Sequence, residues 1–241
     1  MKTIRPFFTF YGGKYRAAPR YPKPKHSRII EPFAGSAGYS MRYPDLNVTL
    51  VDADPVIAGV WDFLIRSTST EIRALPLMSA GQHVDELAVC QEARWFIGFC
   101  LNKGRSAPSK TMSAWGCEPR YSQQFWGETI RERAASQVDR IKHWQIIHGD
   151  YTDAPDVKAT WFIDPPYQVM GKYYVHRHVD YEALATWSRS RRGQVTVCEN
   201  EGATWLPFRP FLTLKANESR TGGKRSKEAI WQNRSTLDGG R

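Results

Sequence analysis

Short apolar runs recur along the chain and alternate with longer segments in which apolar residues are spaced three or four positions apart. Runs of this length, bounded by polar or turn residues, predict buried strands, whereas the wider spacing predicts amphipathic helices. We expect strands at 27–31, 48–51, 144–148, 160–163 and 195–198. Strands that alternate with helices are typical of an α/β fold with a largely parallel sheet.

Four helices are predicted from the same spacing. The first follows Asp54-Pro55, where Asp suits the N-cap and Pro the first helical position. It is marked by Val56, Ile57, Val60, Trp61 and Leu64. Two more amphipathic helices are expected at 84–99 and 126–141, and one runs from an Asp180 cap through Ser190. Apolar runs at 211–215 and 229–231 predict a terminal hairpin.

The strand at 160–163 ends at Asp164-Pro165-Pro166-Tyr167. Proline cannot donate to a sheet ladder, so the strand must stop there, and Pro165 favours an extended Asp164. A carboxylate, rigid carbonyls and an aromatic ring are thereby placed at the carboxyl end of a strand, where open α/β sheets bind ligands. The plain alternative is a strand followed by a proline turn that Asp164 merely caps.

This set suits an exocyclic amine on a planar base. The lone pair of such an amine is delocalised into the ring, and two acceptors for its N–H groups would draw the nitrogen toward tetrahedral geometry. Asp164 and the Pro165 carbonyl are the predicted acceptors, and Tyr167 is the predicted stacking ring. Rigid acceptors aimed at developing positive charge are a form of electrostatic preorganisation.

A second strand breaks into a glycine-rich turn, Glu31-Pro32-Phe33-Ala34-Gly35-Ser36-Ala37-Gly38. Such a turn lets backbone N–H groups approach a ligand closely. It is neither the dinucleotide fingerprint nor a phosphate-binding Walker loop. The next strand ends at Asp52, which is placed to accept ribose hydroxyls, with a second capping residue as the alternative.

Four features follow one another along the chain: a Gly-Gly-Lys segment at 12–14, the glycine-rich turn, an intervening segment and Asp-Pro-Pro-Tyr. In this order of motifs the chain resembles the Dam-type, alpha-group DNA adenine-N6 methyltransferases. The resemblance spans most of the chain. It implies a Rossmann-like S-adenosylmethionine (AdoMet) methyltransferase sheet with helices on both faces, in an α/β fold. It also implies a mainly helical inserted target-recognition domain at 67–145, with the catalytic domain at 1–66 and 146–241.

The resemblance also assigns cofactor contacts. In the Gly-Gly-Lys segment these are Phe10, Tyr11 and Lys14, where either aromatic could be the one packed on AdoMet. In the glycine-rich turn they are Glu31, Pro32, Phe33, Gly35 and Ser36. Asp150 and Tyr151, after the strand at 144–148, would line the adenine pocket, and a simple turn is their alternative. Asp164 is expected to contact the cofactor as well as the substrate.

The chain carries a net charge of +10 and a pI of about 9.5, which points to a polyanion such as nucleic acid. The loop at 101–111 combines basic and hydrogen-bonding side chains suited to phosphates and base edges, and its alternative is an ordinary exposed loop. A basic glycine-containing segment at 217–227 suits phosphate contact. The predicted DNA-binding residues are Asn102, Lys103, Arg105, Lys110, Arg220, Lys224 and Arg225.

Four scattered cysteines without zinc-ligand spacing predict reduced thiols and no metal site. No apolar run is long enough to cross a bilayer, and no signal peptide is recognised, so a cytoplasmic protein is expected.

These observations predict a site-specific methyltransferase that transfers a methyl group from AdoMet to N6 of a flipped adenine in double-stranded DNA. The expected state is a monomer or weak dimer. The alternatives are an N4-cytosine DNA methyltransferase, an RNA adenine methyltransferase, and a nucleic-acid-binding module without catalysis.

Overall fold

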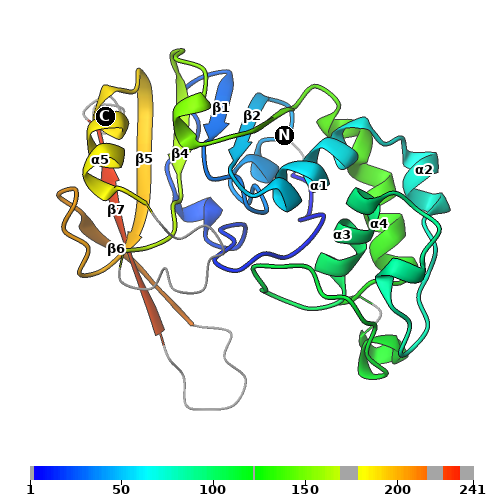
Figure 1. The fold of residues 1–241 in the computed structure, drawn as a ribbon. Coiled ribbons are helices and arrows are strands. Elements are labelled where there is room, and N and C mark those ends of the chain that lie inside the picture. Colours follow the sequence, from blue (N-terminus) through cyan, green and yellow to red (C-terminus); the bar gives the residue numbers. More distant parts are fainter. Residues whose placement is uncertain (1–2, 122, 169–178, 216–224, 234–241) are drawn as a thin grey trace.

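A computed structural model of the chain describes residues 3–121, 123–168, 179–215 and 225–233. Seven strands form one sheet in the order β3-β2-β1-β4-β5-β7-β6 (Figure 1). Their bounds are β1 (Arg28–Glu31), β2 (Asn47–Asp52), β3 (Gln145–His148), β4 (Ala159–Ile163), β5 (Gly193–Asn200), β6 (Arg209–Lys215) and β7 (Arg225–Gln232). All the predicted strands and the terminal hairpin are thereby confirmed.

The first five strands are mutually parallel, and β7 lies antiparallel between β5 and β6. This mixed, Rossmann-like arrangement is typical of the methyltransferase fold. The chain order reverses between β1 and β4, which are neighbours in the sheet. Open α/β sheets bind ligands beyond the carboxyl ends of the strands at such a switch point.

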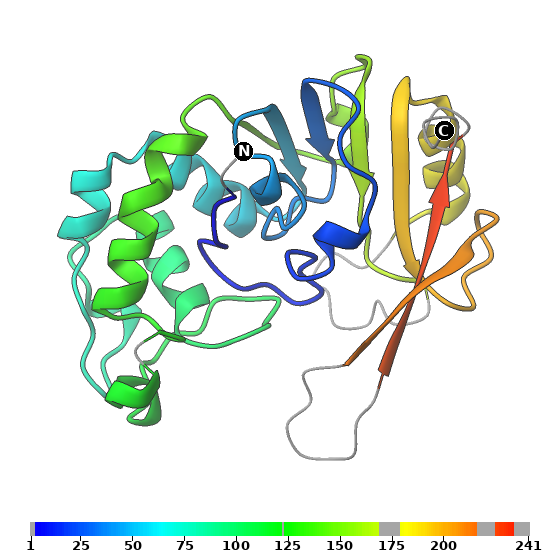
Figure 2. The ribbon, with the colours of Figure 1, turned by 180° about the vertical axis from the view of Figure 1, so that it is seen from behind.

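Every residue of β4 is buried, because neighbouring residues in a strand face opposite sides of a sheet that is covered on both. Phe162 belongs to one hydrophobic core and Trp161 to the other. Helix α1 (Pro55–Arg66) contributes Trp61 to the first core, and α5 (Tyr181–Ser190) contributes Leu184 to the second. Helices therefore cover both faces of the sheet, as expected (Figures 1 and 2).

A mainly helical segment lies between α1 and β3, at one end of the sheet (Figure 1). It comprises α2 (Ser69–Ala74), α3 (Gln91–Cys100) and α4 (Glu128–Val138), with 3-10 helices η3 (Val84–Glu86), η4 (Trp115–Cys117), η5 (Pro119–Tyr121) and η6 (Asp139–Ile141). Its buried side chains join the same hydrophobic cluster as α1 and the N-terminal segment. A separate recognition domain at 67–145 stays a prediction.

The single helix expected at 84–99 is wrong. A capping box at His83 opens the 3-10 helix η3, Leu87 is extended, and α3 begins only at Gln91. The Leu87 carbonyl accepts two hydrogen bonds from the Arg94 guanidinium. A side chain thus donates to the carbonyl that would accept a backbone N–H in a continuous helix. The helix expected at 126–141 is confirmed in its central part as α4, which continues into η6.

Both predicted acidic caps are confirmed. The Asp54 carboxylate accepts the Val56 N–H with Pro55 as the first residue of α1, and the Asp180 carboxylate accepts two N–H groups at the start of α5. Within the described ranges, no helix has both the length and the apolar character needed to cross a bilayer.

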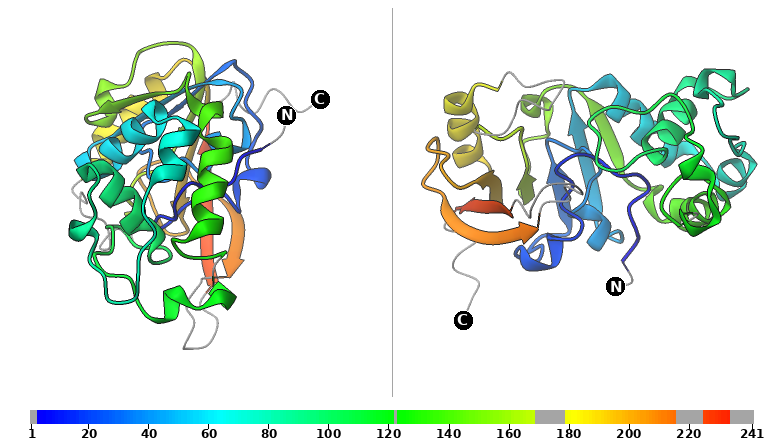
Figure 3. Two further views of the ribbon diagram at one scale, coloured as in Figure 1. Left: turned by 90° about the vertical axis from the view of Figure 1, so that its right-hand side faces the viewer. Right: turned by 90° about the horizontal axis from the view of Figure 1, so that it is seen from below.

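The N-terminal segment passes between the sheet and helices α3 and α4 before it enters β1 (Figures 1 and 3). Short 3-10 helices lie at Ala18–Arg20 (η1), Ser40–Arg42 (η2) and Tyr151–Asp153 (η7). This path carries the Gly-Gly-Lys segment to the carboxyl ends of β1 and β4, where the candidate site lies.

Candidate functional site

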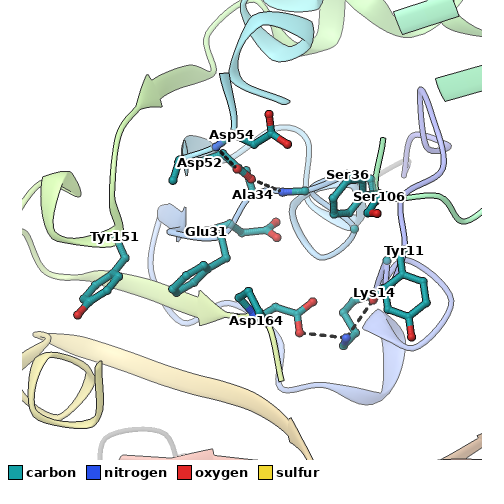
Figure 4. A pocket seen from close by; sticks show the side chains of 18 of the residues that line it. Tyr11, Lys14, Glu31, Ala34, Ser36, Asp52, Asp54, Ser106, Tyr151 and Asp164 are labelled. Carbon is teal, nitrogen blue, oxygen red and sulfur yellow. Dashed lines mark hydrogen bonds and ion pairs between the residues drawn. The ribbon is translucent and has the colours of Figure 1, made fainter. Parts of the chain in front are cut away.

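A cavity of about 440 Å³ lies at the carboxyl ends of β1, β2 and β4. This volume is in the range of small-molecule sites. The cavity is lined by eleven of the twelve predicted cofactor residues: Phe10, Tyr11, Lys14, Glu31, Phe33, Gly35, Ser36, Asp52, Asp150, Tyr151 and Asp164. Figure 4 shows Asp52 on one side of it and Asp164 with Lys14 on another. Pro32 does not line it, and from the proline pair only Pro166 does.

Two glycines let the N-terminal segment lie directly on the glycine-rich turn. Gly35 has a positive φ of 44°, and a Cβ there would be 3.1 Å from the ring of Phe10. A Cβ on Gly38 would be 2.5 Å from the Tyr15 nitrogen, closer than side-chain atoms approach backbone. Glycine at these positions is therefore required by the close approach, and Phe10 is the aromatic that packs on the turn.

Asp52, at the end of β2, is held by the backbone around it. Its Oδ2 accepts the Gly35 N–H at 2.9 Å, and its Oδ1 accepts the Asp54 N–H at 3.0 Å. The Trp61 indole of α1 donates to the Gly35 carbonyl at 2.8 Å and fixes the turn from behind. The Asp52 carboxylate is thereby held at the end of β2 on the wall of the cavity.

Asp150 and Tyr151 follow β3 and form another wall. Asp150 caps η7 by accepting the Thr152 N–H at 3.0 Å, and its predicted contact with an adenine ring stays a prediction. The Tyr151 ring stacks on Phe33 at 5.7 Å and meets Trp187 edge-on at 5.0 Å. These are direct aromatic contacts, so a planar ligand would lie against the exposed side of this pair and not between its rings.

Lys14 and Asp164 form an ion pair at the base of the cavity. The Lys14 Nζ lies 2.9 Å from Asp164 Oδ1 and donates to the Gly12 carbonyl at 2.9 Å (Figure 4). The lysine side chain is 5% exposed and that of Asp164 is 17% exposed. Burial raises the pKa of Asp164, and the neighbouring ammonium opposes that rise. The lysine thus keeps a buried carboxylate available as a hydrogen-bond acceptor.

Tyr167 lies behind this pair. Its hydroxyl donates to Glu228 Oε2 at 2.7 Å, and the Lys14 ammonium lies 4.8 Å from its ring centroid. The residue is 8% exposed and does not line the cavity. Its stacking on a base stays a prediction. The Tyr181 hydroxyl donates to the Pro166 carbonyl at 2.8 Å, which fixes the second proline of the turn.

Glu31 ends β1 on the cavity wall and is buried. Its Oε1 accepts the Ser40 N–H at 2.7 Å. Burial raises the pKa of Glu31 from its ordinary 4.5 to about 8, although the bonds from Ser40 oppose the rise. The folded protein therefore holds a proton here at neutral pH that the unfolded chain has released.

We expect Glu31→Gln to flatten the dependence of stability on pH. Because the pKa of Glu31 is raised in the folded state, protonated Glu31 contributes fully to the free energy of unfolding below pH 4.5. This contribution is lost as the pH rises to about 8. The difference in free energy of unfolding between variant and wild type should change by on the order of 4 kcal/mol between pH 5 and pH 9. Urea unfolding without added ligand measures this change, and parallel curves would contradict the assignment.

Sequence reasoning missed several residues of the site. Glu228 of β7 contacts both Tyr167 and Lys14, and Ser106 lines the cavity. Alternate residues of a strand face the same side of the sheet, so Glu228 shares its face with the fully buried Ile230. This alternation was the feature of the sequence that indicated a buried Glu228. Ser106 carries no such signal, because its position depends on contacts between the 101–111 loop and the N-terminal segment.

The 101–111 loop is joined to the N-terminal segment by hydrogen bonds. The Tyr11 N–H donates to the Arg105 carbonyl at 3.2 Å, and the Thr9 hydroxyl donates to the Asn102 carbonyl at 3.2 Å. The loop therefore borders the cavity. Its four predicted DNA-binding residues, Asn102, Lys103, Arg105 and Lys110, are all exposed.

Two of these side chains have partners within the protein. The Asn102 amide donates to Ser109 Oγ at 2.7 Å, and the Lys103 ammonium donates to Gln124 Oε1. Arg105 and Lys110 remain the simplest candidates for phosphate contact. Arg220 and Lys224 lie outside the described residues, and Arg225 is the first residue of β7.

Comparison with known proteins adds little. No protein-family model matches the chain, and no curated protein matches it. Among solved structures, the chain is similar to a conserved hypothetical protein from Streptococcus pyogenes, with 9% identity, coverage of 88% of both chains and a TM-score of 0.35. This likeness is too distant to carry an argument about function.

Proposed function

We propose that this protein is an AdoMet-dependent DNA methyltransferase that acts on N6 of adenine. The observation that carries the proposal is the position of Asp164. It lies at the switch point of a methyltransferase-type sheet, in a cavity lined by nearly all the residues that the family resemblance assigns to the cofactor. The approaching amine and the cofactor would therefore meet beside one buried carboxylate.

The chemistry of the lining suits AdoMet, which supplies a methyl group already activated on a sulfonium. Asp52 is a carboxylate on the cavity wall at the end of β2, where ribose hydroxyls would bind, and the Tyr151–Phe33 pair offers an aromatic surface to the adenine ring. Gly35 and Gly38 allow the N-terminal segment, with Phe10, to lie directly on the glycine-rich turn beside the cavity. The cavity volume of about 440 Å³ is also in the range of such ligands.

In the proposed reaction, Asp164 accepts one N6 hydrogen and the Pro165 carbonyl accepts the other. The amine nitrogen is drawn toward tetrahedral geometry, so its lone pair becomes available for in-line attack on the methyl carbon. Since the donor is already activated, positioning supplies the larger part of the rate enhancement. Lys14 opposes the rise in the pKa of Asp164 that burial causes and so favours its carboxylate form, and the proton lost from N6 has Asp164 as its neighbouring acceptor.

DNA is the proposed substrate because the exposed cations of the 101–111 loop border the cavity, on a chain with a net charge of +10. An adenine within a duplex cannot reach Asp164, so base flipping is part of the proposal. The helical segment between α1 and β3, which supplies this loop, is the proposed target-recognition region. Tyr167 is the proposed stacking ring, and it lies directly behind the Lys14–Asp164 pair with 8% of its surface exposed.

Arg105→Ala and Lys110→Ala should each weaken DNA binding about equally for all sequences, because phosphate contacts carry no sequence information. The slope of log K against log salt should decrease by about one per contact removed. Fluorescence anisotropy over a salt series measures both effects. Arg66→Ala is the matched control, since Arg66 is the last residue of α1, outside this region, and pairs with Asp62 at the surface. Equal losses in the control would contradict a specific role for the loop.

The decisive experiment incubates the purified protein with labelled AdoMet and either duplex DNA or RNA, followed by nucleoside analysis and mapping of the modified bases. N6-methyladenine in DNA is the expected product. N4-methylcytosine or labelled RNA would replace the proposal with the corresponding alternative. AdoMet binding without any transfer would indicate a nucleic-acid-binding module that has lost catalysis.

A further inference from the structure

Glu228 of β7 is buried beside the Lys14–Asp164 pair. Its side chain is 6% exposed, and Oε2 accepts the Tyr167 hydroxyl at 2.7 Å. The same oxygen lies 3.9 Å from the Lys14 Nζ, which is itself 2.9 Å from Asp164 Oδ1. One ammonium therefore lies between two buried carboxylates, which can be at most about 7 Å apart.

The sheet holds Glu228 in this place. β7 is hydrogen-bonded to β5 on one side and β6 on the other, with Glu228 opposite Asn200 and Leu212. The second carboxylate oxygen accepts the Ser226 hydroxyl at 3.2 Å. A charge fixed by two neighbouring strands and by side-chain donors is preorganised, so it requires no rearrangement when a substrate enters.

We infer, on the basis of the methyl transfer proposed above, that Glu228 is a positioning residue for that reaction. It fixes the Tyr167 ring through its hydroxyl, and it shares the Lys14 ammonium with Asp164. It acts through these two residues and does not itself touch the reacting atoms.

Sharing the ammonium matters because Asp164 must stay ionised and still be a good acceptor. Burial raises the pKa of Asp164, Lys14 lowers it, and Glu228 raises it again. Other groups that face Asp164 are Tyr167, whose hydroxyl lowers the pKa of Asp164, and Glu31, Glu199, Tyr21 and Cys198 on β1, β5 and the N-terminal segment. The last four are unchanged when Glu228 alone is replaced, and Glu228→Gln keeps an acceptor for the Tyr167 hydroxyl, so a change in the titration of Asp164 in that variant reports on the charge of Glu228.

Glu228→Gln removes the charge but retains an oxygen that can accept the Tyr167 hydroxyl. Asp164 would then no longer share the Lys14 ammonium with a second carboxylate, so the pKa of Asp164 should fall. The acidic limb of the kcat–pH profile should therefore move to lower pH by about one unit. Glu228→Asp retains the charge but withdraws the carboxylate from Tyr167. It should leave the acidic limb near its wild-type position and lower kcat by about tenfold with little change in KM.

Glu201→Gln is the matched control. Glu201 is the neighbouring acidic residue that pairs with Lys227 at the surface, and its side chain is 40% exposed. The charge change is the same, but the acidic limb should not move. An inactive wild-type protein would refute the proposed methyl transfer and this inference with it. An active, folded Glu228→Gln protein whose acidic limb coincides with that of the wild type would overturn the inference alone.

Should Glu228→Gln fail to fold, Glu228→Asp decides by itself. A tenfold lower kcat with an unmoved acidic limb supports the positioning role, whereas an unchanged kcat overturns it. Rescue of the fold by the conservative variant would also show that the charge, and not the packing of the side chain, is what the buried cluster requires.

Discussion

Replacing Asp164 with alanine should lower methyl transfer by roughly a hundredfold or more, because a preorganised acceptor of this kind contributes a few kcal/mol to the transition state. Single-turnover kinetics with labelled AdoMet measure the loss without interference from product release. Binding of DNA should be nearly unchanged, since Asp164 acts on an amine that is already in the cavity.

The fold should survive this change, because Lys14 still lies 3.9 Å from Glu228 and keeps a carboxylate partner. Asp156→Ala is the matched control, since Asp156 is 65% exposed in its side chain and pairs with Arg191 on the surface. It should transfer methyl groups at the wild-type rate. If the Asp164→Ala protein did the same, the assignment of the catalytic carboxylate would be wrong.

Lys14→Met should cause the largest loss of stability. It leaves Asp164 and Glu228 buried without their cation, and removing one partner of a buried ion pair reduces the free energy of unfolding by about 3–5 kcal/mol. The loss should be greatest at pH 7.5 and should shrink as the pH falls, because protonation neutralises the stranded Asp164 carboxylate, whose pKa burial raises. Urea unfolding at several pH values measures it.

Lys227→Met provides the comparison for this loss. Lys227 pairs with Glu201 across 3.2 Å, but its side chain is 64% exposed, and surface pairs contribute little to stability. Its replacement should leave the free energy of unfolding within about 0.5 kcal/mol of wild type at every pH. Equal effects of the two substitutions would mean that the buried ammonium does not stabilise the fold.

The strands and the caps could be predicted from the sequence because their signals are local. An apolar run ending in Asp164-Pro165 is necessarily the end of a strand, and Asp54-Pro55 is a helix start in almost any context. The cofactor residues also follow from strand ends, since parallel strands bring their carboxyl ends to one edge. Nearly all of them line the one cavity described above.

What the sequence could not predict depends on contacts between distant residues. Lys14 and Glu228 are more than 200 positions apart, and only the pairing of β7 with β5 brings them within 3.9 Å. The expected helix at 84–99 failed because the 3.6-residue periodicity continued across residues 87–90, where the backbone is extended at Leu87 and at Cys90. Tyr167 was expected to face the ligand, but its hydroxyl has a carboxylate partner in the protein interior.

The place of β7 within the sheet has a consequence for biosynthesis. Because β6 emerges from the ribosome first and yet, in the described sheet, pairs only with β7, it must wait unpaired until the later strand has been made. Glu228 arrives with that later strand. A nascent chain that can already assemble most of the cofactor cavity would thus lack the last buried charge of its reaction centre. Completion of the edge of the sheet and acquisition of the proposed activity would then be a single late event in the maturation of the protein.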